Sequence, residues 1–153
     1  MGEPPLYLVR HGKAGDRKRW SENDRLRPLS KAGRRQAEGL VRAFRGLEVD
    51  RILSSPFLRC EQTVRPLAID RGLPLEVTDL LAEGAPLAGL LDLIEEGDGA
   101  VVACGHGDLI PEAIAHLRER GVPADDGPTK KASTWLLERE HGSVLRARYL
   151  PPP

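Results

Sequence analysis

The sequence has little of what marks several common classes of protein. Only 2 of its 153 residues are cysteine, which argues against the disulfide framework of a small secreted domain. Aromatic residues make up 4% and the formal net charge is zero, which argues against nucleic acid or a membrane surface as a partner. No stretch approaches the roughly 18 consecutive apolar residues of a transmembrane helix, and no basic and apolar leader is evident. We therefore expect a soluble, cytoplasmic protein.

The length and the charge distribution narrow this expectation. A chain of 153 residues predicts one domain, residues 1–153, large enough to bury roughly 70% of the surface of its unfolded chain. The charge is uneven, because residues 1–45 contain 12 Lys or Arg and 5 Asp or Glu. An anionic ligand would be attracted to this first third of the chain.

Strand and helix patterns alternate along the chain. Short apolar runs predict buried strands, and apolar residues at helical spacing predict amphipathic helices between them. This alternation predicts an α/β fold with a mainly parallel central sheet and helices on both faces. A hairpin at the sheet edge is expected near the C-terminus. The predicted strands are 6–9, 51–54, 75–78 and 100–104, the helices follow Ser30, Ser55 and Pro86 and cover 110–117, and the hairpin pairs 134–140 with 144–150.

Two histidines follow predicted strands directly. Arg10-His11-Gly12 comes after the first strand, and Gly105-His106-Gly107 comes after the strand at 100–104. Ligands of open α/β sheets bind at the carboxyl ends of the parallel strands. The two histidines, far apart in sequence, are therefore expected to face one pocket.

A third motif fits the same place. Ser54-Ser55-Pro56 ends a predicted strand and starts a helix, with Ser55 as N-cap and Pro56 in the first helical position. Arg59 then lies about one turn inside this helix. The guanidinium groups of Arg59 and Arg10 are planar donors that match the oxygens of a phosphoryl group.

Together the three motifs resemble the histidine phosphatase superfamily, also called the phosphoglycerate mutase-like superfamily. The resemblance covers about residues 6–140 and implies a three-layer α/β/α sandwich. No long insertion separates Arg59 from Glu83 or follows His106. The chain is therefore most similar to the compact bacterial branch, which includes protein phosphohistidine phosphatases and phosphatase domains attached to some Nudix hydrolases.

The chemistry of these residues predicts a metal-independent phosphatase. A neutral histidine nitrogen can attack phosphorus and form a covalent phosphohistidine, and His11 is the predicted nucleophile. Arg10, Arg59 and His106 are predicted to bind the transferring phosphoryl group, and the resemblance assigns the same four positions. These donors supply the charge that a metal ion supplies elsewhere, so no metal and no cofactor is predicted. The expected substrate is a phosphomonoester or a phosphohistidine, on a small molecule or a protein.

The proton donor for the leaving group is less well defined by the sequence. Glu83 matches in position the glutamate that many family members use as general acid, and Asp79 and Asp24 are alternatives. Lys13, and either Lys130 or Lys131, could add positive charge near the pocket, although lysines at such positions are commonly solvated.

Three other interpretations remain open at this point. A phosphomutase would have to protect its phosphohistidine from water, and the short chain has no obvious cap for that purpose. A non-catalytic module that binds phosphorylated ligands is disfavoured by the presence of both His11 and His106. A metal site at Cys104 and His106 has too few ligands. The sequence predicts no particular oligomeric state.

Overall fold

The computed structural model describes residues 2–153. Six strands form one sheet in the order β3-β2-β4-β1-β5-β6. The four strands from β3 to β1 are parallel, and β5 and β6 are antiparallel to their neighbours. The strands are β1 (Glu3–Arg10), β2 (Arg51–Ser54), β3 (Leu75–Val77), β4 (Val101–Gly105), β5 (Thr134–Glu140) and β6 (Ser143–Leu150).

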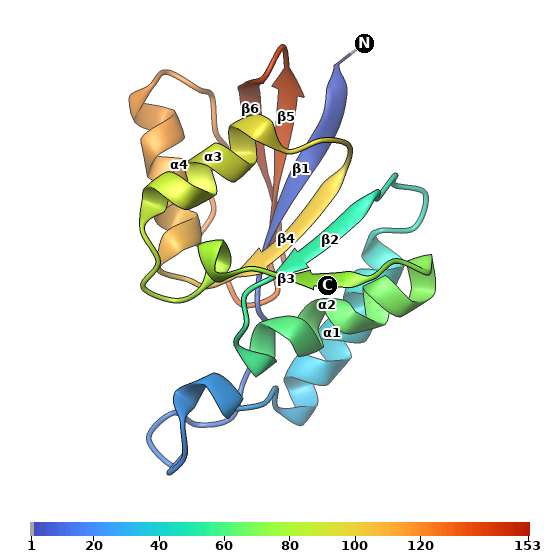
Figure 1. Ribbon diagram of the computed structural model, residues 1–153, viewed down its shortest axis with the longest axis vertical. Helices are drawn as coiled ribbons and strands as arrows, with labels where there is room; N and C mark the ends of the chain where they lie inside the picture. The colour runs from blue at the N-terminus through green and yellow to red at the C-terminus, as the bar shows by residue number, and fades with distance from the viewer. Residues whose placement is uncertain (1) are drawn as a thin grey trace.

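Helices cover both faces of this sheet (Figure 1). The helices α1 (Lys31–Ala43) and α2 (Leu58–Arg71) lie on one face, and α3 (Leu87–Glu96) and α4 (Leu109–Glu119) on the other. Successive side chains of a strand point to opposite faces. Accordingly, Leu6 and Leu8 of β1 pack in the core below α3 and α4, whereas Tyr7 and Val9 pack in the core below α1 and α2. The predicted mainly parallel α/β/α sandwich is confirmed.

The C-terminal hairpin also follows its prediction. β5 pairs with β1, and β6 forms the edge of the sheet. The turn between them consists of His141 and Gly142, both with positive φ (53° and 76°). Two such residues favour a hairpin turn whose twist matches that of the strands.

The start of α2 differs from the prediction. The helix begins at Leu58, with Phe57 as N-cap, so Ser55 is not the N-cap and Pro56 is not helical. Ser55 Oγ does accept the N–H of Phe57 at 3.2 Å, but it also bonds to the imidazole of His106 at 2.8 Å. The segment 55–57 therefore stays outside the helix, and it keeps the hydrogen bond between Ser55 and His106, which joins the ends of β2 and β4.

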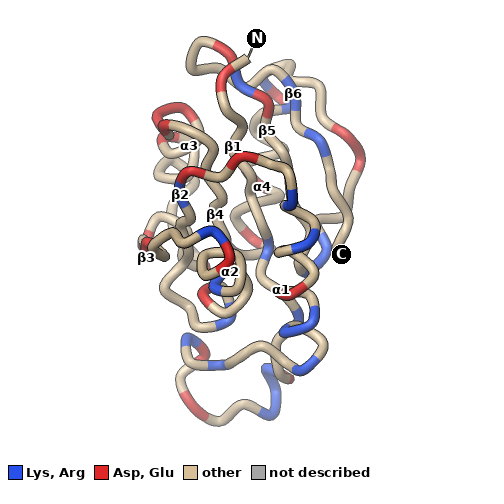
Figure 2. The backbone as a smooth tube through the Cα atoms, turned by 90° about the vertical axis from the view of Figure 1, so that its right-hand side faces the viewer, with Lys and Arg blue, Asp and Glu red and all other residues tan. Residues whose placement is uncertain are grey.

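The loop between β1 and α1 projects beyond the carboxyl ends of the parallel strands (Figure 1). It contains the short 3-10 helix η1 (Asp24–Leu26) and carries residues of both charges (Figure 2). Arg27 Nη1 donates to the carbonyl of Gly15 at 2.6 Å and closes the loop on itself. At Gly33 in α1 a Cβ would lie 1.9 Å from the carbonyl oxygen of Lys13, so glycine is required where this loop meets the helix. Across residues 2–153, no helix has the length and apolarity needed to span a membrane.

Candidate active site

His11 follows β1 directly, and its side chain is 94% buried, with 6% exposed. Its Nδ1 lies 2.7 Å from the carbonyl oxygen of Gly12. Because a carbonyl only accepts hydrogen bonds, Nδ1 carries the hydrogen, and Nε2 of the neutral ring keeps a free lone pair. Burial lowers the pKa of His11 to about 3, and electrostatic interactions with His106, Arg59 and Arg10 add to this shift against the opposing bond to Gly12. The imidazole is therefore neutral at physiological pH.

Arg10 is the last residue of β1, and its guanidinium group lines a cavity beside His11. Nη1 donates to the backbone oxygen of Thr129 at 2.8 Å, while Nε is buried without a partner. Gly107 lies directly against this group, since a Cβ there would be 2.5 Å from Arg10 Cζ. Glycine at this position makes room for the guanidinium group at the strand ends.

His106 follows β4 and is 1% exposed. Its ring centroid lies 5.3 Å from that of His11, so the two histidines meet as predicted. Nε2 of His106 lies 2.8 Å from Ser55 Oγ, which already accepts the N–H of Phe57. The hydroxyl hydrogen of Ser55 is thus available to Nε2, which leaves the ring hydrogen on Nδ1. That Nδ1 is buried without a partner.

Arg59, in the first turn of α2, is fully buried. Nη1 donates to the backbone oxygen of Asp24 at 2.9 Å, and Nη2 lies 3.1 Å from the Asp24 carboxylate and 3.5 Å from that of Glu83. Its guanidinium carbon lies 4.9 Å from the centroid of the Phe57 ring. Nε has no partner. Two carboxylates therefore balance a buried positive charge that still has one free donor.

The structure brings all four predicted residues together. In residues 2–153, the buried side-chain nitrogens without a hydrogen-bond partner belong to Arg10, Arg59 and His106. A buried donor left unpaired costs roughly 1–3 kcal/mol, so native proteins contain few of them. Three such donors, on residues at the same end of the sheet as the neutral imidazole of His11, are typical of a site that binds an anion.

Glu83 is the one candidate acid that lines the cavity. Its carboxylate lies 3.0 Å from Arg17 Nη2 and 3.5 Å from Arg59 Nη2. A carboxylate in an ion pair accepts hydrogen bonds, and it must take up a proton before it can donate one.

The two alternative acids are placed differently. Asp24 contacts the guanidinium groups of Arg59 and Arg27, at 3.1 Å and 2.9 Å. Burial raises the pKa of Asp24, but the hydrogen bonds from Arg27 and Arg59 outweigh this and lower it below its ordinary value. Asp79 has a side chain that is 92% exposed and lies 3.9 Å from Arg25, outside the cavity lining. Asp24 thus holds Arg59 in place, and Asp79 faces solvent.

The cavity has a volume of about 430 Å³. Sequence reasoning missed Arg17 and Arg27 in its wall, and the signal for them was the excess of basic residues before residue 45. Of the lysines considered, Lys131 lines the cavity, and Lys13 and Lys130 do not. The lining residues are Arg10, His11, Ala14, Gly15, Asp16, Arg17, Arg27, Glu83, Gly107, Asp108 and Lys131.

The two cysteines lie near this site without forming a disulfide. Both Cys60 and Cys104 are free and buried, and Cys60 Sγ lies 3.4 Å from His106 Nε2. Within the described part of the chain, no group of three or more His, Cys, Asp or Glu side chains is placed to hold a metal ion. The pair Cys104 and His106 therefore gains no third ligand of these types.

Comparison with known proteins identifies the family. The model of the histidine phosphatase superfamily (branch 1) matches residues 6–86, which is more than half of the chain. The chain therefore belongs to the histidine phosphatase superfamily, and the family predicted from its motifs is confirmed.

Several relatives are named phosphatases. The chain is 36% identical over 156 residues to an 8-oxo-(d)GTP phosphatase of Mycolicibacterium smegmatis, with 97% of this chain and 48% of the relative covered. It thus spans about half the length of that relative. It is 29% identical to the phosphohistidine phosphatase SixA of Escherichia coli, with 90% and 89% covered. A solved structure of a SixA-type protein from Agrobacterium tumefaciens has a TM-score of 0.74 and 25% identity, covering 98% of this chain and 99% of that one.

Proposed function

We propose that this chain hydrolyses phosphorylated substrates through a covalent phosphohistidine on His11. One observation carries this proposal: His11 is a buried imidazole kept neutral, with its Nε2 lone pair free and its ring 5.3 Å from that of His106, and Arg10, Arg59 and His106 each keep one buried donor without a partner. A neutral imidazole is a nucleophile, and preorganised donors stabilise the negative charge of a transferring phosphoryl group.

In the first step, Nε2 of His11 attacks phosphorus while the bond to the leaving group breaks. Nε of Arg10, Nε of Arg59 and Nδ1 of His106 would hold the oxygens of the phosphoryl group. In the second step, water attacks the phosphorus, the P–N bond breaks, and inorganic phosphate leaves. Preorganised donors of this kind contribute several kcal/mol each in a site that excludes water.

The leaving group distinguishes the roles of the acids. Glu83 lines the cavity and is the proposed general acid for alcohol leaving groups, after its ion pair with Arg59 is exchanged for the substrate. Asp24, held between Arg59 and Arg27, acts as a positioning residue for the Arg59 guanidinium group. The proposed reaction uses no metal ion and no cofactor, because the guanidinium groups supply the positive charge and the imidazole of His106 supplies a further donor.

The names of the relatives suggest two substrate classes. One relative is named a phosphohistidine phosphatase and the other an 8-oxo-(d)GTP phosphatase. We therefore place the substrate among phosphohistidine proteins and phosphorylated small molecules, in the cytoplasm, where both occur. Neither nucleic acid nor a membrane is part of this proposal.

The covalent intermediate is tested by rapid quenching with labelled substrate, in acid and in base. Phosphohistidine is lost in acid and kept in base, so label should remain on the protein only after the basic quench. The His11→Asn variant is the control and should carry no label. Label that survives acid, or that persists in His11→Asn, would assign the nucleophile to another residue.

Turnover after exhaustive chelation should equal that of the untreated protein, and a loss restored by Mg²⁺ or Zn²⁺ would contradict the metal-free mechanism.

A further inference from the structure

The cavity extends beyond the proposed phosphoryl site. Its volume of about 430 Å³ lies within the range of about 300–1,000 Å³ that is typical of small-molecule sites. The phosphoryl group of a substrate would occupy the part beside His11 and Arg10. The remaining wall carries a second set of cationic groups, Arg17, Arg27 and Lys131.

The backbone holds Lys131 in a fixed position relative to His11. The next residue, Ala132, donates its N–H to the carbonyl oxygens of Arg10 (3.0 Å) and His11 (3.1 Å). On the other side, the carbonyl of Thr129 accepts from Arg10 Nη1 at 2.8 Å. Thr129 and Ala132 both have positive φ (46° and 67°). Non-glycine residues adopt this strained conformation where surrounding contacts impose it, often at functional sites.

The surroundings of Lys131 are electropositive. Lys131 is exposed at the cavity rim, but partial loss of solvent lowers its pKa, and the charges of Arg10, Arg27, Lys13 and Arg17 lower it further. Arg17 and Arg27 are paired with carboxylates. Lys131 has no carboxylate within 4 Å in the part of the chain that the structure describes. An anion bound here would relieve the repulsion among these groups.

The acid in the cavity favours a substrate that needs little proton donation. Glu83 is engaged by Arg17 and Arg59. An alcohol leaves poorly as an anion, whereas a phosphate group is a weak base and leaves readily. No aromatic side chain other than the His11 imidazole lines the cavity, so nothing in its described wall stacks on a base or sugar. The wall carries four cationic side chains, Arg10, Arg17, Arg27 and Lys131, against three carboxylates, Asp16, Glu83 and Asp108.

We propose that Lys131, with Arg17, forms a subsite for a second phosphate group, so that the enzyme removes the terminal phosphoryl group of a phosphoanhydride. This proposal rests on the proposed function. Nε2 of His11 would attack the terminal phosphorus, and the bond from that phosphorus to the bridging oxygen would break. The electron pair of that bond stays with the leaving phosphate, which Lys131 and Arg17 hold. Water then releases inorganic phosphate from His11.

The test compares a substrate with one phosphate group and a substrate with two. The probes are p-nitrophenyl phosphate and adenosine 5′-diphosphate, and the matched variants are Lys131→Met and Lys130→Met. Both lysines are exposed, and Lys130 differs in that it does not line the cavity. In Lys131→Met, the ratio of kcat/KM for the diphosphate to that for p-nitrophenyl phosphate should fall about ten- to hundredfold, as expected for the loss of one charge-assisted contact. Lys130→Met should keep the wild-type ratio.

Inhibition supplies a second readout. Inorganic pyrophosphate should inhibit the wild-type enzyme more strongly than inorganic phosphate does, and Lys131→Met should remove most of that preference. An unchanged ratio in Lys131→Met, or an equal loss for both substrates, would overturn the subsite. The proposed function fails separately, if the wild-type protein turns over neither substrate and forms no base-stable phosphoenzyme. Turnover of p-nitrophenyl phosphate through phosphohistidine, without any preference for two phosphates, overturns the subsite alone.

Discussion

Buried arginines occur at both ends of the parallel strands, and their hydrogen bonds differ. Arg139 in β5 lies near the amino ends of β1 and β4 and is 3% exposed. Its guanidinium group makes five hydrogen bonds of 2.8–3.2 Å, all to backbone carbonyls, namely those of Pro4 (twice), Ile94, Gly97 and Gly99. A guanidinium group has five N–H donors, so this residue is fully satisfied by the fold.

Arg59, which is fully buried, and Arg10, which is half-buried, lie at the carboxyl ends of the strands and are not satisfied in this way. Each has a buried Nε without a partner, and His106 beside them has an unpaired Nδ1. Burial of an arginine therefore does not by itself indicate function. The comparison indicates that Arg139 stabilises the fold, whereas Arg10 and Arg59 each keep one donor without a partner in the protein, as the proposed function requires.

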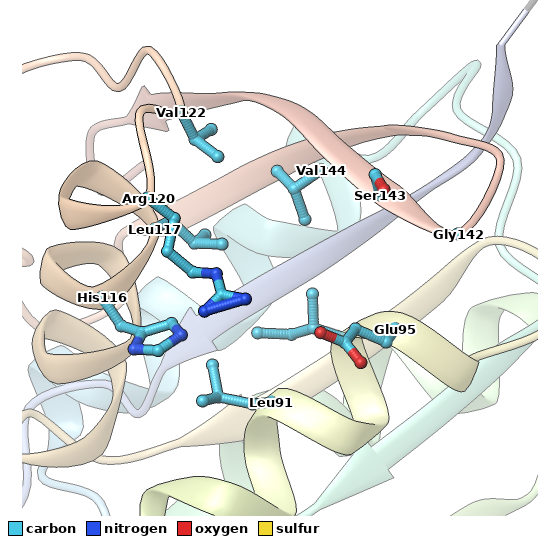
Figure 3. Close-up of a pocket in the computed structure, with 10 residues that line it drawn as sticks. Leu91, Glu95, His116, Leu117, Arg120, Val122, Gly142, Ser143 and Val144 are labelled. Carbon is cyan, nitrogen blue, oxygen red and sulfur yellow. The ribbon is translucent and has the colours of Figure 1, made fainter.

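A second cavity is also lined by a histidine and an arginine, and it supports the distinction between satisfied and unpaired donors. His116 and Arg120 of the α4 region line a cavity of about 280 Å³ between α3, α4 and the turn before β6 (Figure 3). Its floor includes Leu91, Leu117 and Val144. His116 is half-buried and Arg120 is exposed, so water can satisfy the donors of both. The described wall of the cavity at His116 and Arg120 therefore lacks the buried, unpaired donors that Arg10, Arg59 and His106 have.

The largest expected effect is at His11. His11→Asn keeps a polar side chain of similar size but removes the attacking nitrogen. Turnover of p-nitrophenyl phosphate should fall by several orders of magnitude, in the range of roughly 10⁴ to 10⁶ seen when a catalytic nucleophile is removed. Steady-state kinetics measures this, and an unchanged circular dichroism spectrum controls for folding. Residual activity within about tenfold of the wild type would contradict the assignment.

Arg59→Lys should cost about ten- to a thousandfold in kcat. Lysine keeps the charge but replaces a rigid planar fork by a single ammonium group on a flexible chain, so the donor aimed at the phosphoryl oxygen is lost. The measurement is kcat with saturating p-nitrophenyl phosphate. A rate close to that of the wild type would place Arg59 outside contact with the substrate.

Arg139→Lys should show the opposite pattern. Lysine has three donors in place of five, so buried carbonyls lose partners and the free energy of unfolding should drop by about 2–3 kcal/mol. The kcat of the folded protein should be unchanged, because Arg139 lies at the other end of the strands. Urea denaturation and kinetics on the same sample separate the two effects. A large loss of kcat at unchanged stability would break the distinction between the two kinds of buried arginine.

Glu83→Gln should have an effect that depends on the leaving group. Glutamine cannot deliver a proton, so hydrolysis of an alkyl phosphate should fall at least about tenfold more than that of p-nitrophenyl phosphate, whose leaving group is stable as an anion. The ratio of the two kcat/KM values is the measurement. Equal losses on both substrates would assign Glu83 to binding, through its contacts with Arg17 and Arg59.

The smallest expected effect is that the imidazole of His11 does not titrate near neutral pH. Because burial lowers the pKa of His11 to about 3, its ring resonances should not move between pH 8 and about 4.5. Two-dimensional NMR measures this, with His11→Asn used for assignment. Between pH 6.5 and about 3 the unfolded chain takes up a proton at His11 and the folded protein does not, so stability decreases as the pH falls through this window. His11→Asn should lack that contribution, and a His11 titration near pH 6.5 would contradict the neutral buried state.

Much of the fold follows from local patterns in the sequence. Apolar runs and helical spacing predict strands and helices in the right order, because burial of one face repeats every second residue in a strand and at helical spacing in a helix. The main error, the start of α2, has a tertiary cause. Ser55 and Pro56 look like a helix start, but the hydroxyl of Ser55 is engaged by His106, which is distant in sequence.

For the candidate site too, some features follow from the sequence and others only from the tertiary structure. The sequence alone predicts His11, His106, Arg10 and Arg59 as site residues, because each lies in a short motif at a predicted strand end or helix start. Only the tertiary structure decides that Asp24 pairs with Arg59, that Asp79 faces solvent, and that Lys131 rather than Lys130 lines the cavity. A sequence motif shows which side chains lie at the end of a strand or the start of a helix. Pairing, burial and free donors depend on contacts between segments far apart in the chain, which only the packed structure brings together.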